Sequence, residues 1–352
     1  MDIKIHNNYC NISKLITFNF GDIMKYSILF IFIAFIHSTI INIPADYSTI
    51  QEGINNTATG DTVLVSPGEY IEEIILSRSV TLMSTSGADS TFISPPDSVE
   101  IAINAADFLI FNTLNISGFT IQNAGWGIHM TSYNATLNIS DCKIIGNDIG
   151  MKTERHIRWN LDHCILDENG IGIYHDYYGF NSSITNCTFA NSNMNVYFRP
   201  NYASPTLEIM NSVFFGDIYG ESCQINVQYS NLFNFTEETE TIDFLDGVIH
   251  LDPLLINPSS GDYSLQIASP CIDAGNPDLN LNGITWENDL DDQDPDGTRM
   301  DMGAFYFHQN SGCGDILAVN YDPSALIDDG SCIYLEDVEP HFSTVWSGVP
   351  NN

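Results

Sequence analysis

The sequence has few basic residues for its length. Its 352 residues include 10 Lys and Arg against 45 Asp and Glu, which gives a formal net charge of −35. A nucleic-acid-binding protein needs a basic surface to neutralise phosphates, so this class is excluded. Hydrophobic residues make up 43% of the chain, with 20 Phe and 16 Tyr, which excludes a mainly disordered acidic protein. A globular acidic protein remains.

The sequence also lacks a clear membrane-spanning segment. The apolar run from Ile28 to Ile36 follows Met24-Lys25 and is shorter than the ~20 residues that a spanning helix needs. A charged start, a short apolar core and small polar residues after it are typical of a secretory signal peptide, which we place at residues 24–39. Residues 1–23 are interpreted as an upstream extension. We expect the mature chain to be secreted, or held at the cell surface, with no membrane span.

Helical periodicity is missing as well, and a repeat of about 23 residues takes its place. β-Forming residues recur in columns, which are Ile116, Ile139, Leu161, Ile184 and Ile209; Ile121, Ile144, Leu166, Phe189 and Phe214; and Ile128, Met151, Ile173 and Val196. One coil of this length cannot bury its own apolar face, but coils stacked ~4.8 Å apart align each column into a continuous interior. The repeat predicts an all-β fold, a single-stranded right-handed parallel β-helix.

Turn-forming residues separate the short β-forming runs. The asparagines fall into one set, Asn123, Asn147, Asn169 and Asn191, and the glycines into another, Gly127, Gly150 and Gly172. Both sets are predicted to lie in turns between short strands.

Both ends of this region resemble secreted bacterial proteins with the pectin-lyase-like β-helix. At the start, the resemblance lies in Ile43-Pro44-Ala45-Asp46-Tyr47-Ser48-Thr49-Ile50 and Gly60-Asp61-Thr62-Val63. At the end it lies in Ser269-Pro270-Cys271-Ile272-Asp273-Ala274-Gly275 and Asp296-Gly297-Thr298-Arg299-Met300-Asp301-Met302-Gly303. The resemblance implies a β-helix domain over residues 43–308. We expect residues 48–55 to form a short amphipathic capping helix, which hides the edge of the first coil. The resemblance implies no particular activity, because such a scaffold hosts unrelated functions.

A small module follows at residues 312–333. Gly312-Cys313-Gly314-Asp315 and Asp328-Asp329-Gly330-Ser331-Cys332 resemble a two-cysteine repeat found near the C-termini of secreted bacterial proteins. A unit of this size has little core, so the resemblance implies a stabilising Cys313–Cys332 disulfide. Residues 334–352 are interpreted as a tail that belongs to a truncated further domain.

The remaining cysteines allow two interpretations. Cys142, Cys164 and Cys187 fall in one inward column, where reduced cysteine packs as a small apolar residue. The alternative is a reactive thiol or metal site, but no column of His or acidic residues flanks them. Cys223 and Cys271 form a second candidate pair, which sequence alone does not fix.

A surface stripe is the first candidate binding site. The residues after the column Ile128, Met151, Ile173 and Val196 should point outward, and they are His129, Lys152, Tyr174 and Tyr197. Arg155, Arg158 and Arg199 fall beside them. Tyr rings can stack on sugars, and Arg or Lys can pair with uronate carboxylates, so the pattern indicates a groove for acidic polysaccharide. In the alternative interpretation, Tyr is an ordinary outward strand residue and the bases pair with Asp148, Glu154, Asp162 and Glu168.

A polysaccharide lyase is the enzymatic alternative. Trp159-Asn160-Leu161-Asp162-His163-Cys164 is similar to the Trp-Ile-Asp-His-Cys segment of pectate lyases, with one residue inserted. The resemblance implies that Asp162 is a calcium ligand and that Arg199 or Lys152 is the catalytic base. Arg199-Pro200 matches the lyases' Arg-x-Pro-x-x-Arg segment only loosely, and the hydrolase motifs Asn-Thr-Asp, Gly-Asp-Asp and Gly-His-Gly are absent.

An acidic segment near the end of the β-helix is the candidate calcium site. Asp292, Asp294 and Asp296 alternate before Gly297, with Asp301 close by, and this resembles the start of an EF-hand-like loop. Gly303 occupies the twelfth position, where an acid is expected. In the alternative interpretation, Arg299 pairs with these acids in a solvated turn.

Three functions therefore compete. The first is a secreted or cell-surface β-helix protein without a complete catalytic motif, which binds polysaccharide or cell-surface glycan. The second is a calcium-dependent lyase that cleaves uronate polymers by β-elimination. The third is a passive spacer for a missing C-terminal domain. In each case we expect a monomer that binds no nucleic acid, with calcium as the single cofactor to consider.

Overall fold

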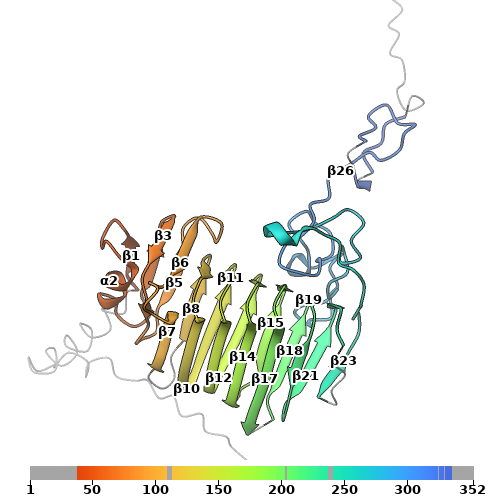
Figure 1. The fold of residues 1–352 in the computed structure, drawn as a ribbon. Helices are drawn as coiled ribbons and strands as arrows, with labels where there is room; N and C mark the ends of the chain where they lie inside the picture. Colours follow the sequence, from red (N-terminus) through yellow and green to blue (C-terminus); the bar gives the residue numbers. More distant parts are fainter. Residues whose placement is uncertain are drawn as a thin grey trace, which may run out of the picture.

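The chain folds into a stack of coils whose strands pair in parallel with the equivalent strands of neighbouring coils (Figure 1). The computed structural model describes residues 38–108, 113–202, 204–236, 241–323, 325–328 and 330–334. The predicted extension, most of the signal peptide and the tail beyond Tyr334 lie outside these residues. No helix in the described part of the chain is long and apolar enough to cross a membrane.

Two parallel sheets run the length of the stack. The larger has a main path of β1 (Ile40–Ile43), β2 (Thr62–Val65), β5 (Thr81–Ser84), β8 (Thr113–Ser117), β10 (Trp126–Ser140), β12 (Ile149–Asp162), β15 (Ser182–Thr185), β18 (Thr206–Met210), β21 (Gln224–Gln228) and β23 (Ile242–Phe244). Off this path lie β4 (Ile74–Ile75), β7 (Ile101–Phe108), β14 (Ile171–Tyr178), β17 (Met194–Tyr202) and β20 (Ile218–Gly220). The second sheet contains β3 (Gly68–Ile71), β6 (Thr91–Ser94), β9 (Thr120–Gln122), β11 (Lys143–Ile145), β13 (Ile165–Asp167), β16 (Thr188–Ala190), β19 (Val213–Phe215) and β22 (Asn231–Phe233).

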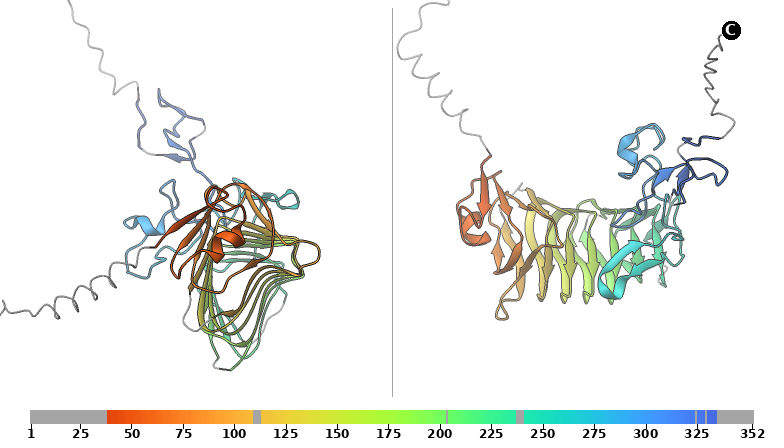
Figure 2. Two further views of the ribbon diagram at one scale, coloured as in Figure 1. Left: turned by 90° about the vertical axis from the view of Figure 1, so that its left-hand side faces the viewer. Right: turned by 90° about the horizontal axis from the view of Figure 1, so that it is seen from above.

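The strand registers align the predicted columns. Ile128 pairs with Met151, Met151 with Ile173 and Ile173 with Val196, and the Ile116 and Ile121 columns are aligned in the same way. All of these residues are buried in one core. Seen along the axis, the coils superpose into one outline (Figure 2). The prediction of a parallel β-helix is therefore confirmed.

Several strands are longer than the short runs that the sequence predicts. β10 and β12 each continue through a bend instead of stopping, with a register shift between Tyr133 and Ala135. Asn134 and Arg155 take positive φ angles of 59° and 72° at this bend. A single residue in the left-handed region turns the strand without ending the ladder.

The glycine set was wrongly predicted to lie in turns. Gly127, Gly150 and Gly172 are the second residues of β10, β12 and β14. A Cβ on Gly172 would lie 2.5 Å from the backbone oxygen of Asn195, and the other two face the next coil at 2.6 and 2.7 Å. None of the three has a positive φ, so glycine is required here for the close approach of neighbouring coils and not for an unusual backbone conformation.

The asparagine set divides between two neighbouring positions of the coil. Asn123 and Asn191 have left-handed φ angles of 58° and 48° in the turn. Asn147 and Asn169 are buried beside it, where the Asn147 amide donates to Asn169 Oδ1 at 3.1 Å. The second pair therefore forms an inward hydrogen-bonded ladder rather than an exposed turn.

The predicted capping helix is present as α2 (Ile50–Asn55). Ile50 and Ile54 are buried against the first coils, and Thr49 caps the helix by accepting the N–H of Glu52 at 3.1 Å. Glu72, from the next coil, accepts the N–H groups of Ile50 and Gln51, both at 2.9 Å. The helix is thus held by apolar packing and by hydrogen bonds from the backbone N–H groups of its first turn.

Residues 252–308, called here the closing region, pack on the outer face of the second sheet. They include the hairpin β24 (Leu255–Asn257) and β25 (Asp262–Leu265) and two 3-10 turns, Pro258–Ser260 and Leu290–Asp292. Tyr263, Met302 and Ala304 share a second apolar cluster with Ile165 and Val213 of the coils. The closing region therefore covers apolar side chains on the outer face of the second sheet, which would otherwise be exposed to solvent.

The cysteines confirm the predicted disulfide and answer the pairing that the sequence left open. Cys313 and Cys332 form the disulfide of the C-terminal module, which also contains β26 (Ser311–Gly312) and β27 (Ile327–Asp328). Cys142, Cys164 and Cys187 are free and buried in line, where burial raises the pKa of the Cys142 and Cys164 thiols well above the usual value. Cys223 and Cys271 are both free: the Cys223 thiol donates to the Phe198 carbonyl at 3.6 Å, and Cys271 accepts from the Asn231 amide at 3.3 Å. The column therefore packs as apolar residues do.

Candidate functional site

A row of tyrosines stands on the outer face of the larger sheet. Register pairs Tyr174 with Tyr197 and Tyr197 with Tyr219, and we call these three residues the tyrosine ladder. Their ring centroids lie 5.2 and 4.9 Å apart, with interplanar angles of 2° and 13°. The rings therefore stack on one another, so the ladder presents ring edges and hydroxyls outward rather than the open faces that the sequence predicts for sugar stacking.

The ladder hydroxyls are not equivalent. The Tyr174 hydroxyl donates to Asp176 at 3.2 Å, and the Tyr219 hydroxyl donates to Glu221 at 3.2 Å. The Tyr197 hydroxyl between them has no hydrogen-bond partner in the described part of the chain. Tyr219 was not predicted, although extending the Ile128 column one further coil to Ile218 would have identified it.

His129 and Lys152 continue the row but do not face open solvent. His129 is buried, with its ring centroid 4.8 Å from that of Trp126. The Lys152 amine lies 3.8 Å from the centroid of the Trp126 ring and 3.3 Å from Glu154, and its side chain is 17% exposed. The predicted surface stripe is therefore not exposed at His129, because Trp126, at the start of the same strand, packs against its ring.

A second outward row runs beside the ladder through Glu154, Asp176 and Arg199. Arg199 forms an ion pair with Asp176 at 3.1 Å, and this hydrogen bond raises the pKa of the guanidinium further. Burial opposes ionisation of Asp176, but hydrogen bonds from the Tyr177 N–H and Arg199 outweigh it and lower the Asp176 pKa. Arg199 is therefore held in its charged form and is a poor general base.

The bend of β10, β12 and β14 gathers aromatic and basic side chains, which we call the arginine corner: Tyr133, Arg155, His156, Arg158, Tyr178 and Phe180. Arg155 lies 5.1 Å from the centroid of the exposed Tyr133 ring, and His156 stacks on Tyr178 at 4.3 Å. Arg158 lies 6.0 Å from the Phe180 ring and lines a hollow of about 300 Å³ beside it.

These two arginines differ from the other bases of the stripe. Both are exposed, and neither forms an ion pair with a carboxylate among the described residues. Of the four acids that the alternative interpretation names, Glu154 alone pairs with a stripe base, Lys152. Arg158 Nε donates to the Asn181 carbonyl at 3.2 Å, but the charge of neither arginine is balanced by a carboxylate of the described residues.

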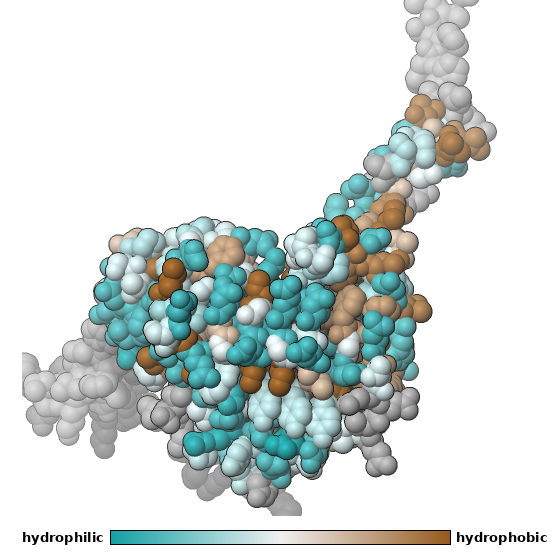
Figure 3. All heavy atoms as spheres, viewed as in Figure 1, coloured by the Kyte–Doolittle hydropathy of each residue, from teal (hydrophilic) through white to brown (hydrophobic). Residues whose placement is uncertain are grey.

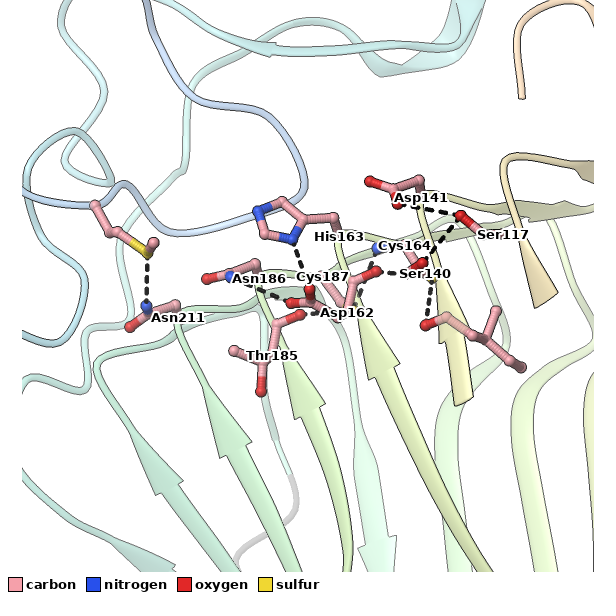
Figure 4. A network of polar contacts seen from close by, with 12 residues as sticks. Ser117, Ser140, Asp141, Asp162, His163, Cys164, Thr185, Asn186, Cys187 and Asn211 are labelled. Carbon is pink, nitrogen blue, oxygen red and sulfur yellow. Dashed lines mark hydrogen bonds and ion pairs between the residues drawn. The ribbon is translucent and has the colours of Figure 1, made fainter. Parts of the chain in front are cut away.

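A cleft of about 520 Å³ lies at another corner, between the coils and the closing region (Figure 3). His163 and Asn186 line it from the coils, and Asp294, Asp301 and Phe305 line it from the closing region. Asp162 accepts from Asn186 at 3.3 Å and lies 3.0 Å from Nδ1 of His163, which leaves the other ring nitrogen facing the closing region (Figure 4). The hydrogen bond to Asp162 is the main cause of the raised His163 pKa. Asp162 is predictable from the sequence, but the cleft beside it is not.

The structure does not assemble the lyase constellation. Asp162 is the last residue of β12, whereas Lys152 lies near the start of that strand, on the other side of its bend. Lys152 pairs with Glu154 and Arg199 with Asp176, and no bond joins either base to Asp162. Trp159, from the same similar segment, is fully buried in the core.

The acids predicted to bind calcium are used inside the closing region. Asp294 accepts the N–H of Asp301 at 2.9 Å, and Asp301 accepts those of Asp273 and Phe307 at 2.7 and 2.6 Å. Asp296 accepts from Thr298 and Gln309. No three His, Cys, Asp or Glu residues in the described ranges lie together as a metal site. Arg299 donates to the Gly275 carbonyl rather than to these acids.

Acidification should stabilise the closing region. Burial, together with the charge of Asp301, raises the pKa of Asp294 to about 8, and burial raises that of Asp301 to about 6. The ordinary value is 3.8 for both, so between pH 4 and 8 the folded chain holds protons that the unfolded chain releases, and the free energy of unfolding falls as pH rises. The raised pKa of His163 acts in the same direction.

This pH dependence is measured as the midpoint of urea unfolding between pH 5 and 9, in the presence of EDTA. Asp294→Asn should flatten the profile and raise the midpoint at pH 9, whereas Asp243→Asn, at an exposed position of β23, should change neither. A wild-type midpoint that rises from pH 5 to 9 would contradict this assignment.

No family model matches the chain. A cell surface glycoprotein of Methanothermus fervidus is 32% identical over 111 residues, which are 31% of this chain and 16% of the glycoprotein. The chain thus spans about a sixth of the length of this curated relative. Among solved structures, a pectin methylesterase from Aspergillus niger has a TM-score of 0.45 at 14% identity, over 66% of this chain and 90% of that one. The carrot pectin methylesterase has a TM-score of 0.41 at 13% identity, over 60% and 81%. By its own strand register, this chain is a parallel β-helix protein.

Proposed function

We propose that this chain is an exported β-helix protein that binds an acidic polysaccharide at the cell surface, along the tyrosine ladder and the arginine corner. The observation that carries the proposal is the pair of exposed arginines without a carboxylate partner on β12, the strand that pairs with β14 and its ladder residue Tyr174. The similarity to a cell surface glycoprotein supports the location.

The chemistry of the face supports a glycan of repeating units. A parallel ladder places equivalent side chains at each coil, ~4.8 Å apart, so its hydroxyls meet a polymer at regular intervals. Arg155 and Arg158 offer planar donors that suit a uronate carboxylate. The charge of the whole chain, −35, repels polyanions at long range, so affinity must come from these local contacts.

The test compares binding of polygalacturonate with binding of its methyl-esterified form, by isothermal titration calorimetry. Arg155→Ala combined with Arg158→Ala should weaken binding of the free acid at least ~10-fold and leave the ester within ~2-fold, because two charge-assisted hydrogen bonds are removed. Tyr197→Phe should weaken both ligands ~5-fold, the effect of one hydrogen bond.

Tyr321→Phe is the matched control, because Tyr321 is an exposed tyrosine of the C-terminal module. Panels of alginate and glycosaminoglycans extend the test to other uronates. No binding to any acidic polymer, or equal binding by all variants, would remove the proposal. Ultraviolet-absorbing unsaturated product in the same samples would instead favour the lyase.

A further inference from the structure

The closing region contains a second acidic segment that the sequence predictions did not use. From Asp278 to Asp289 the chain has Asp at position 1, Asn at positions 3 and 5, Gly at position 6 and Asp at position 12. This is the spacing of a twelve-residue calcium loop, in which odd-numbered side chains and the last acid supply oxygen ligands. The expected site at Asp292 lacks the twelfth acid, whereas this one has it.

The structure brings these four side chains to one place. Asp278 accepts the N–H groups of Asn282 and Gly283, both at 2.9 Å. The side-chain amide nitrogens of Asn280 and Asn282 both donate to one oxygen of Asp289, at 3.1 and 2.6 Å. Gly283 has a φ of 82°, which the sharp turn at position 6 requires. Positions 1, 3, 5 and 12 therefore converge although they are spread over the whole loop.

An independent observation is a buried carboxylate that bonds to this loop. Asp292 is fully buried, and one of its carboxylate oxygens accepts the N–H of Leu279, the second residue of the loop, at 2.7 Å. Its other oxygen is buried without a partner. A buried carboxylate in this state is costly unless a cation lies nearby. Arg299 is not this cation, because it donates to the carbonyls of Gly275 and Ala274.

We infer that residues 278–289 bind one calcium ion. The ligands are the carboxylates of Asp278 and Asp289, the amide oxygens of Asn280 and Asn282, and the carbonyl of Ile284 at position 7. Calcium fits better than magnesium because it accepts many neutral oxygen ligands in a flexible arrangement. With two carboxylates among the ligands, the dissociation constant should lie near the ~0.1–1 mM of extracellular modules.

Terbium luminescence with the full exported chain tests the inference, because Trp286 occupies position 9 and can sensitise a bound lanthanide. Excitation of tryptophan should give terbium emission that calcium competes away. Asp278→Asn and Asp289→Asn should each weaken terbium and calcium binding at least tenfold. Asp291→Asn is the matched control, since this exposed acid lies outside the loop, and it should bind within twofold of the wild type.

Two further measurements complete the test. Trp286→Phe should remove the emission while calcium binding by calorimetry stays unchanged, which places the ion at this loop. Far-ultraviolet circular dichroism in EDTA shows whether each variant is folded, and Asn280→Ala repeats the test without removing a charge. No binding at millimolar calcium, or binding that survives Asp278→Asn and Asp289→Asn but is lost in Asp294→Asn, would overturn the inference.

Discussion

Replacing Gly172 with alanine should destabilise the β-helix by at least ~3 kcal/mol, the upper part of the range for forced overpacking. The added Cβ would lie 2.5 Å from the backbone oxygen of Asn195 and 3.4 Å from the Phe189 ring. A backbone oxygen of the adjacent coil cannot move away without widening the spacing that the ladder hydrogen bonds fix. We expect a large fall in the guanidinium midpoint followed by circular dichroism.

Gly314→Ala is the matched control for this substitution. Gly314 also lacks a positive φ, but no heavy atom lies within 4 Å of the Cβ position. It should leave the midpoint unchanged. If Gly172→Ala behaved like this control, the coils would have to be further apart at this column than the structure shows.

Replacing Trp159 with alanine should cost about 3–5 kcal/mol, as other buried Trp and Phe truncations do. Trp159 is the largest fully buried side chain in the described core and packs edge-on against Phe198, at a centroid distance of 6.0 Å and an angle of 83°. The measurement is the free energy of unfolding in guanidinium at pH 7.

Trp159→Phe separates loss of volume from loss of the indole N–H. That N–H is buried without a hydrogen-bond partner, so phenylalanine removes an unsatisfied donor while keeping most of the packing. We expect a cost under ~1.5 kcal/mol. A cost as large as that of alanine would mean that the N–H makes a contact on which the fold depends.

The fold was predictable because one rule acts at every coil. An inward residue in a parallel ladder must lie above its equivalent, so the spacing of Ile128, Met151 and Ile173 determines the register of the strands that contain them. The capping helix was predictable for a similar local reason, since Thr49 and Glu52 are a recognisable helix start.

The candidate site was less predictable, because it depends on contacts between neighbours that a column does not encode. The burial of His129 requires knowing that Trp126 packs over it. The stacking of Tyr174 on Tyr197 leaves edges and hydroxyls exposed, which alternation alone cannot distinguish from open ring faces. The cleft requires Ala304 to reach Thr188 across 116 residues of chain. No local pattern predicts a contact of that separation.

The uniform spacing of the coils has a consequence for how such a protein changes length. Apart from β20, which pairs with β17 alone among the described strands, each strand from β10 to β21 bonds to equivalent strands of the coils on either side. A duplicated segment equal to one period could therefore be accommodated between two existing coils, with its ends meeting the same partners as before. The rod would grow by ~4.8 Å, and the row of phenols would gain or lose one step according to which segment was copied. The length of the rod and the number of stacked phenols therefore change together when a coil is added or lost.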